Sequence, residues 1–192
     1  AASDVYKRQI QDRSPDAVVL AVGAAPAVPP VPGIDSPKVI DCVTALTGPD
    51  LPGQRVLVVG GGLVGVEGAH HLASLLKEVT VVEMRDGIAL DEGPAPRKDL
   101  LQDLANNGAK AYTSTTVDEI TDHSVIVSGA HNEEIPADTV VLAIGRVSNT
   151  ALAEELTAAG VDVRIITPGI PDKKLIYSIT RSFYHNLVQD GV

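Results

Sequence analysis

Arg55–Glu83 reads RVLVVGGGLVGVEGAHHLASLLKEVTVVE, and this stretch predicts how the rest of the chain is organised. A short apolar run, Val56 to Val59, is followed by three glycines and a helical stretch. A second apolar run then ends at Glu83. The order strand, glycine turn, helix, strand is typical of a β-α-β unit that holds the phosphates of a dinucleotide.

The glycines stand where such a unit needs residues without a side chain. Gly60 permits the sharp turn out of the first strand, Gly62 lets a pyrophosphate approach the backbone, and Gly65 lets the helix lie close to the strand. The N–H groups and dipole of the first helical turn then face the phosphate charge. The cofactor-binding residues expected in this turn are Gly60, Gly61, Gly62, Leu63, Val64 and Gly65.

An acidic residue ends the second apolar run, at the distance from the glycines that a ribose-binding residue needs. Glu83 can accept hydrogen bonds from the adenosine ribose hydroxyls, which favours NADH over NADPH. Arg85 could instead pair with the 2′-phosphate of NADPH, and Met84 lies between the two candidates. The alternative is that Glu83 is an exposed acid at a strand end.

Composition narrows the class of protein. The 192 residues are 44% apolar and 3% aromatic, which suits a parallel sheet packed by aliphatic side chains. A formal net charge of −10 argues against nucleic acid or an anionic membrane surface as partner. No apolar stretch approaches the ~20 residues of a membrane-spanning helix, and the first residues do not resemble a signal peptide. We therefore expect a cytoplasmic protein.

Before the glycine turn, the sequence predicts a buried strand, an extended crossover and a short strand candidate. Residues 1–15 lack periodicity and are predicted to be a disordered or appended end. Asp16–Gly23, DAVVLAVG, is predicted to be a buried strand. Ala24–Pro37 contains five prolines and should be an extended crossover. Lys38–Asp41 is a short strand candidate, and Thr47–Gly53 has turn composition.

After the glycine turn, we expect a helix at Leu63–Leu76, a strand at Val79–Met84 and a second helix at about Arg97–Asn106. Asn107-Gly108 should end that second helix. Residues 109–137 are predicted to form short strands with turns, in a β-meander.

Asp138–Gly145, DTVVLAIG, repeats DAVVLAVG of Asp16–Gly23 with six of eight positions identical. Two strands that both end at glycine could flank a flat ligand, so Gly23, Ala143 and Gly145 are further cofactor-binding candidates. The alternative is that buried parallel strands share these aliphatic residues in any case.

The last part of the chain is predicted to contain a helix capped by Asn149 and ended by Gly160. A strand at Val161–Ile166 and a closing amphipathic helix at Lys173–Gln189 should follow.

The histidines and the cysteine give little indication of a metal site or a catalytic site. His70 and His71 lie within the predicted helix without Cys or carboxylates at metal spacing, so we expect no metal site. Cys42 is the one cysteine, so no disulfide-reductase chemistry can run from this chain. We therefore assign no catalytic residue.

Several segments together resemble a known family. VVLAVGAAP, VLVVGGGLVGVEGAHHLA, VTVVEM and IPADTVVLAIGRVSN resemble flavoproteins with two dinucleotide-binding domains. EVTVVEMRDGIALD and RKDLLQDLANNGAK are similar to the C-terminal part of NADH:flavin oxidoreductases of the 2,4-dienoyl-CoA reductase and trimethylamine dehydrogenase group. Those enzymes join this part to an old-yellow-enzyme-like barrel that carries FMN and an iron–sulfur cluster.

The resemblance implies an α/β fold: a Rossmann-like, three-layer NAD(H)-binding domain with a β-meander at 52–137, inserted in a partial FAD-type domain at 16–51 and 138–192. It also implies that Glu67 lies near the nicotinamide, although an acid stabilised by the helix dipole is the simpler alternative. The family's first GxGxxG, its barrel and its cluster cysteines do not occur in this sequence, and Thr167-Pro168 replaces its usual Gly-Asp. The chain therefore resembles a fragment, with FAD expected in the full-length enzyme.

Three functions fit these observations. The first is the NADH-binding, electron-input module of a flavin-dependent enoate or dienoyl-CoA type reductase, in which hydride passes from NADH to flavin. The second is a module that binds NAD or ADP without turnover. The third is a Rossmann-like methyltransferase, against which the repeated strands and the position of Glu67 count.

Overall fold

The glycine-rich stretch folds as the predicted β-α-β unit, with β4 (Arg55–Val59), α3 (Leu63–Ser74) and β5 (Glu78–Val82). The computed structural model describes residues 2–48 and 52–165. The chain divides into two units, Pro26–Arg146 and the combination of Ala1–Ala25 with Val147–Val192, which are described separately below.

A five-stranded parallel sheet is the centre of the unit Pro26–Arg146. Its strand order is β3 (Val39–Asp41), β10 (Thr139–Leu142), β4, β5 and β6 (Lys110–Tyr112). β4 lies between β10 and β5, so Val58 pairs with Val141 on one side and with Val81 on the other. The predicted range 52–137 lies within this unit, whose sheet also includes β3 and β10.

Alternate residues of the strands pack into two different cores. Val56 and Val58 face the helices α2 (Cys42–Thr47), α3 and α4 (Pro94–Asn106), whereas Leu57 belongs to the core on the opposite face. Both cores are aliphatic, as the low aromatic content predicts.

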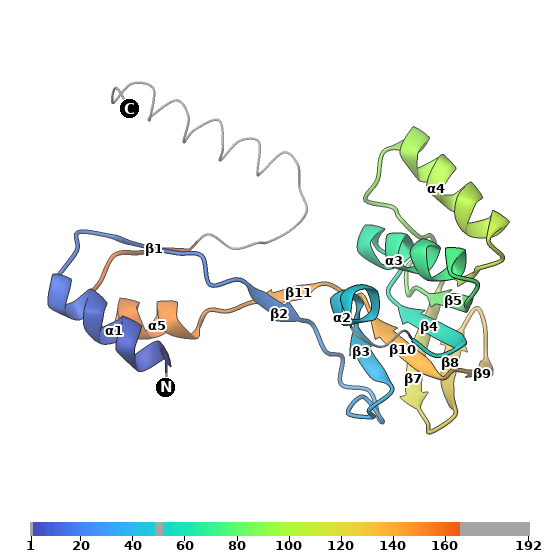
Figure 1. Ribbon diagram of the computed structural model, residues 1–192, viewed down its shortest axis with the longest axis horizontal. Helices are drawn as coiled ribbons and strands as arrows, with labels where there is room; N and C mark the ends of the chain where they lie inside the picture. Colours follow the sequence, from blue (N-terminus) through green and yellow to red (C-terminus); the bar gives the residue numbers. More distant parts are fainter. Residues whose placement is uncertain (1, 49–51, 166–192) are drawn as a thin grey trace. The chain divides into compact units, whose positions relative to one another are not determined.

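The opposite face is covered by an antiparallel meander of β7 (Thr115–Ile120), β8 (Ser124–Gly129) and β9 (Glu133–Pro136). Helices, parallel sheet and meander are thus three layers, which confirms the predicted Rossmann-like α/β fold with a β-meander (Figure 1). The strand within 109–113 differs from the expectation, because β6 joins the parallel sheet through β5 instead of the meander.

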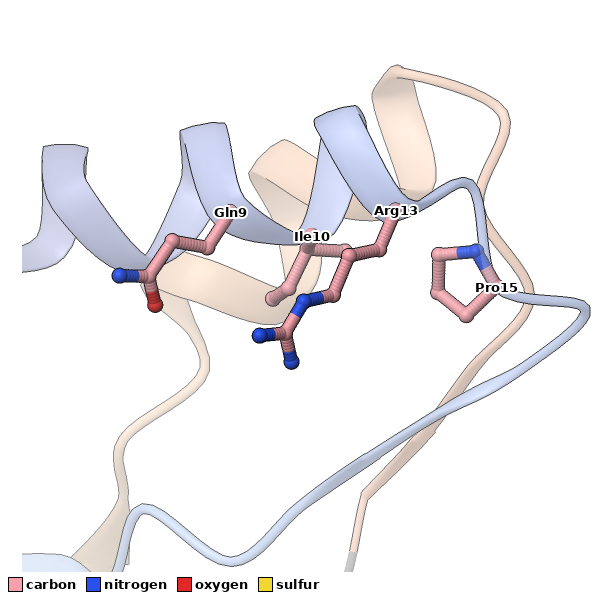
Figure 2. Close-up of a pocket in the computed structure, with 4 residues that line it drawn as sticks. All are labelled: Gln9, Ile10, Arg13 and Pro15. Carbon is pink, nitrogen blue, oxygen red and sulfur yellow. The ribbon is translucent and has the colours of Figure 1, made fainter.

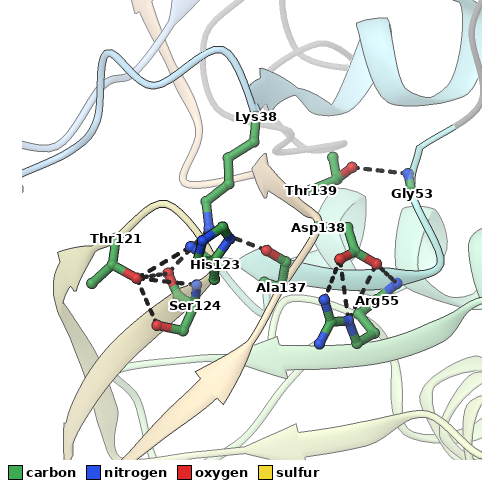
Figure 3. A network of polar contacts seen from close by, with 9 residues as sticks. All are labelled: Lys38, Gly53, Arg55, Thr121, His123, Ser124, Ala137, Asp138 and Thr139. Carbon is green, nitrogen blue, oxygen red and sulfur yellow. Dashed lines mark hydrogen bonds and ion pairs between the residues drawn. The ribbon is translucent and has the colours of Figure 1, made fainter.

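Polar contacts anchor the start of β10 (Figure 3). The carboxylate of Asp138 accepts a hydrogen bond of 2.9 Å from the amide of Arg55 and pairs with the Arg55 guanidinium. This guanidinium holds the pKa of the Asp138 carboxyl at about 2. Lys38 donates to the carbonyl oxygens of Ser124 and Ala137, both at 3.1 Å. Asp138, the first residue of the repeated motif, therefore has a structural partner in this unit.

The other unit contains α1 (Ala2–Arg13), β1 (Val18–Leu20), α5 (Ala151–Ala158) and β12 (Val163–Ile165). The expectation of an unstructured end at 1–15 is wrong, because α1 packs on α5 and Ile10 contacts their small core. The strand predicted at Asp16–Gly23 is present, but it is shorter and less buried than expected. β1 has three residues, pairs with β12, and leaves Val19 58% exposed.

The start of two helices differs from the predictions, and in each case a side-chain hydrogen bond explains the difference. α2 was not expected, and it begins because the Asp41 carboxylate accepts hydrogen bonds from the amides of Val43 and Thr44. α5 begins after Thr150, because the side chain of Asn149 instead donates to the carbonyl oxygen of Val22.

The remaining connections follow the predictions. Gly108 and Gly160 adopt positive φ angles after α4 and α5 and end these helices. The proline-rich crossover contains the short strand β2 (Ala24–Pro26), which pairs with β11 (Arg146–Ser148). The predicted helix Lys173–Gln189 lies outside the described residues.

Candidate nucleotide-binding site

Backbone contacts at Gly60 and Gly65 leave no room for side chains. Gly60 has a φ of +106°, and a Cβ there would lie 2.6 Å from the carbonyl oxygen of Ala143. A Cβ on Gly65 would lie 2.0 Å from the carbonyl oxygen of Gly60. The turn after β4 and the close approach of α3 thus have the geometry expected of a dinucleotide-binding turn.

The first turn of α3 presents main-chain donors. Gly62 is the N-cap and provides no side-chain cap. Among residues 2–48 and 52–165, none accepts a hydrogen bond from the amides of Gly62, Leu63 or Val64. A Cβ placed on Gly62 would have one neighbour within 4 Å, Oδ2 of Asp91 at 3.9 Å. Amides arranged in this way at a helix N-terminus suit a phosphate group.

Gly61 has a different environment from its neighbours. Its amide donates to Oε2 of Glu83 at 2.6 Å, and its carbonyl oxygen accepts a hydrogen bond from the amide of Ala89 at 2.6 Å. A Cβ on Gly61 would lie 2.4 Å from Cγ2 of Ile88. Gly61 therefore connects the turn to the end of β5 and to the loop that follows it.

Glu83 is buried, with 6% of its surface exposed, so the alternative of an exposed strand-end acid is wrong. Oε1 of Glu83 accepts hydrogen bonds from the amide of Arg85 at 2.8 Å and from its Nε at 3.2 Å. Together with Gly61 this makes three hydrogen bonds, and an ionised carboxylate can accept about four. Within the described residues, one of these acceptor positions has no partner.

The loop between β5 and α4 contributes residues that sequence patterns did not identify. Asp91 lies 3.4 Å from Nη1 of Arg85, and Ile88 and Ala89 are buried against the glycine turn. The stretch RDGIALDEG has turn composition and carries no periodic signal that could have predicted this contact.

The other predicted cofactor-binding residues do not all lie at the glycine turn. Ala143 packs directly on Gly60 and Gly65. Gly145 has a φ of +102°, and its carbonyl oxygen accepts a hydrogen bond of 3.0 Å from Ala27. Glu67 is exposed on α3, and Met84 is 74% exposed. Gly23 belongs to the other unit, where it accepts a hydrogen bond from Asn149.

Cys42 has a packing role. Its Sγ lies 3.9 Å from the carbonyl oxygen of Val64, and a Cβ on Gly68 would lie 2.8 Å from that sulfur. Burial, with the nearby charges of Asp41 and Glu67, raises the pKa of the Cys42 thiol. A neutral, enclosed thiol packs α2 against α3 and is a poor nucleophile.

Three further features of the described residues bear on function. A surface pocket in the unit that contains α1 is lined by Gln9, Ile10, Arg13 and Pro15, none of them a predicted site residue (Figure 2). No cluster of His, Cys, Asp or Glu within 2–48 and 52–165 could hold a metal ion. In the same ranges, no helix is both long enough and apolar enough to cross a bilayer.

Comparison with known proteins identifies the protein family to which this chain belongs. Residues 4–167 match the family described as pyridine nucleotide-disulphide oxidoreductase, and the chain belongs to that family. Its members bind NAD(H) and FAD and are pyridine nucleotide-dependent flavoprotein oxidoreductases. This membership argues against the methyltransferase alternative.

Individual relatives are larger proteins. The chain is 34% identical to a metal reductase of Desulforamulus reducens, over 91% of this chain and 30% of that protein. It is 36% identical to an NADH oxidase of Thermoanaerobacter brockii, over 88% and 27% of the two chains. A structure of 2-naphthoyl-CoA reductase with 2-naphthoyl-CoA matches with a TM-score of 0.73 and 31% identity, covering 83% of this chain and 24% of that one. The chain thus spans less than a third of these relatives.

Proposed function

We propose that this chain is the NADH-binding, electron-input module of a flavin-dependent oxidoreductase of the enoate or 2,4-dienoyl-CoA reductase type. One observation carries the proposal: the open amides at the start of α3 lie beside Glu83, which Gly61 and Arg85 hold at the end of β5. Main-chain donors suited to a pyrophosphate, next to an acceptor suited to a ribose hydroxyl, support this proposal.

Each residue has a defined binding task. The amides of Gly62, Leu63 and Val64 donate to pyrophosphate oxygens, and the dipole of α3 adds to the attraction. Glu83 accepts from an adenosine ribose hydroxyl through its remaining lone pair. Glu67, exposed on α3, is the candidate for contact with the nicotinamide end. Bound NADH supplies a hydride to a flavin, and this chain positions the donor.

The reductase type rests on the resemblance of EVTVVEMRDGIALD to the 2,4-dienoyl-CoA reductase group and on the match to 2-naphthoyl-CoA reductase. Because the chain spans less than a third of its relatives, we propose that a barrel with FMN and an iron–sulfur cluster is its partner in the whole enzyme. In this proposal 52–137 is the NAD(H)-binding domain, and 16–51 with 138–192 belong to the FAD-type domain.

A second function is binding of NAD or ADP without turnover by this chain alone. It is favoured by the single GxGxxG motif in the sequence, at Gly60–Gly65. FAD needs a glycine turn of its own for its pyrophosphate. The residues of this chain therefore fit NAD(H) better than they fit FAD.

Absorption spectra and NADH titration separate the two functions. Flavin bands in the purified protein, bleached by added NADH, are expected of a complete electron-input unit. A colourless protein that binds NADH indicates a binding module. A protein that binds none of NADH, NADPH, NAD and ADP contradicts both.

A further inference from the structure

The loop between β5 and α4 folds back onto the glycine turn. Ala89 donates to the carbonyl oxygen of Gly61 at 2.6 Å, and Ile88 is buried beneath it. Nε of Arg97, from the first turns of α4, donates to the carbonyl oxygen of Ile88 at 2.9 Å. These contacts fix the loop at the edge of the proposed dinucleotide site.

Three charged groups meet where this loop begins. The Arg85 guanidinium contacts Glu83 through Nε at 3.2 Å and Asp91 through Nη1 at 3.4 Å. Asp91 faces the glycine turn as well, since its Oδ2 is the nearest atom to a Cβ placed on Gly62, at 3.9 Å. Arg85 is therefore shared between two carboxylates.

We infer that Asp91 is a specificity-determining residue that disfavours NADPH relative to NADH, an inference that rests on the proposed dinucleotide function. The two ligands differ by a ribose 2′-phosphate. Asp91 competes with this phosphate for the Arg85 guanidinium, and the phosphate must approach the carboxylates of both Glu83 and Asp91. Like charges a few ångströms apart repel even near a protein surface, whereas the ribose hydroxyl of NADH carries no charge.

The test compares Asp91→Asn with Asp86→Asn in the whole chain, with Kd for NADPH and NADH measured by fluorescence titration. Asp86 is an exposed acid on the same loop, and no ion pair or hydrogen bond of its side chain is observed within the described residues. Asp86→Asn therefore removes the same charge as Asp91→Asn without removing a contact to Arg85. The side chain of Asp91 is 56% exposed, so Asp91→Asn should fold, and Asp91→Ser should behave in the same way.

The measured quantity is the ratio of Kd for NADPH to Kd for NADH. Any effect on the pyrophosphate is common to both ligands and cancels in this ratio. We expect the ratio to fall about tenfold in Asp91→Asn and less than about twofold in Asp86→Asn. Adding Arg85→Ala to Asp91→Asn should reduce the gain, because part of it comes from the Arg85 guanidinium that Asp91 releases.

The outcomes separate this inference from the proposed function. Binding of NADH with an equal ratio in Asp91→Asn and Asp86→Asn overturns the role of Asp91 and leaves the proposed function standing. Failure of the unmodified chain to bind either dinucleotide overturns both.

Discussion

The amide of Gly61 donates a 2.6 Å hydrogen bond to Oε2 of Glu83, across 22 residues of sequence. Both groups are buried, and a hydrogen bond to a charged group contributes about 1.5–3 kcal/mol. The contact couples the glycine turn to the acid at the end of β5. The proposed pyrophosphate donors and the proposed ribose acceptor are therefore parts of one assembly.

The proposed ribose contact predicts the effect of Glu83→Gln. Loss of the negative charge should weaken NADH binding by about 1.5–3 kcal/mol, which raises Kd roughly 10- to 100-fold. Fluorescence titration measures the change, and Glu78→Gln at the opposite, exposed end of β5 serves as control. Unchanged affinity in Glu83→Gln, with the protein folded, contradicts the assignment.

Close packing of α3 against the turn predicts that Gly65→Ala destabilises the fold. The new Cβ would lie 2.0 Å from the carbonyl oxygen of Gly60, so the helix must shift. Overpacking of this kind costs about 1–3 kcal/mol. Urea unfolding measures the loss, and a midpoint equal to that of the unmodified protein would show that the helix moves without cost.

Gly62→Ala is the matched control for Gly65→Ala. We expect it to lower NADH affinity while leaving stability almost unchanged. Gly62 has a φ of −66° that alanine tolerates, and the nearest neighbour of its Cβ is 3.9 Å away. Stability should change by about 1 kcal/mol or less. NADH affinity should fall about tenfold, because the methyl group occupies the space through which the pyrophosphate approaches. Equal NADH binding by Gly62→Ala and the unmodified chain argues against that approach.

The Asp138–Arg55 pair predicts a pH-dependent contribution to stability. The pKa of the Asp138 carboxyl is lowered from 3.8 to about 2 in the folded chain. Its contribution is therefore complete above pH 3.8 and is lost as the pH falls toward 2. Urea midpoints of the unmodified protein and of Asp138→Asn should differ at neutral pH and converge near pH 2. Because the pair is exposed, added salt should also reduce the difference.

The environment of Cys42 predicts slow thiol chemistry. Cys42 is 7% exposed, and burial raises the pKa of its thiol, so the reactive thiolate is scarce at neutral pH. Labelling by an aromatic disulfide reagent should be at least about tenfold slower in the folded protein than in urea. Rapid labelling under native conditions contradicts a packing role.

Periodic and glycine signals predicted the central unit well. β4, α3 and β5 lie where the apolar runs and the glycine turn placed them, and the meander follows α4. These elements depend on local requirements: alternation along β4 that serves two cores, and a φ at Gly60 that other residues rarely adopt.

Elements that depend on distant partners were missed or misjudged. α1 has little apolar pattern and is stabilised through Ile10 against α5. β1 shares the motif of β10 yet lacks its burial, because β10 has a strand on each side whereas β1 pairs with β12. Identical residues thus occupy different environments, and the motif alone cannot distinguish them.

The sequence by itself determined the order of strand, glycine turn, helix and acid, because each depends on the conformational freedom or periodicity of neighbouring residues. Tertiary structure decided that Glu83 is buried on Gly61 and that Asp91 reaches Arg85. Those contacts form when β5 pairs with β4 and the loop after it folds back on the turn. The charged side chains of Glu83, Arg85 and Asp91 therefore come together through tertiary packing, which local sequence patterns do not encode.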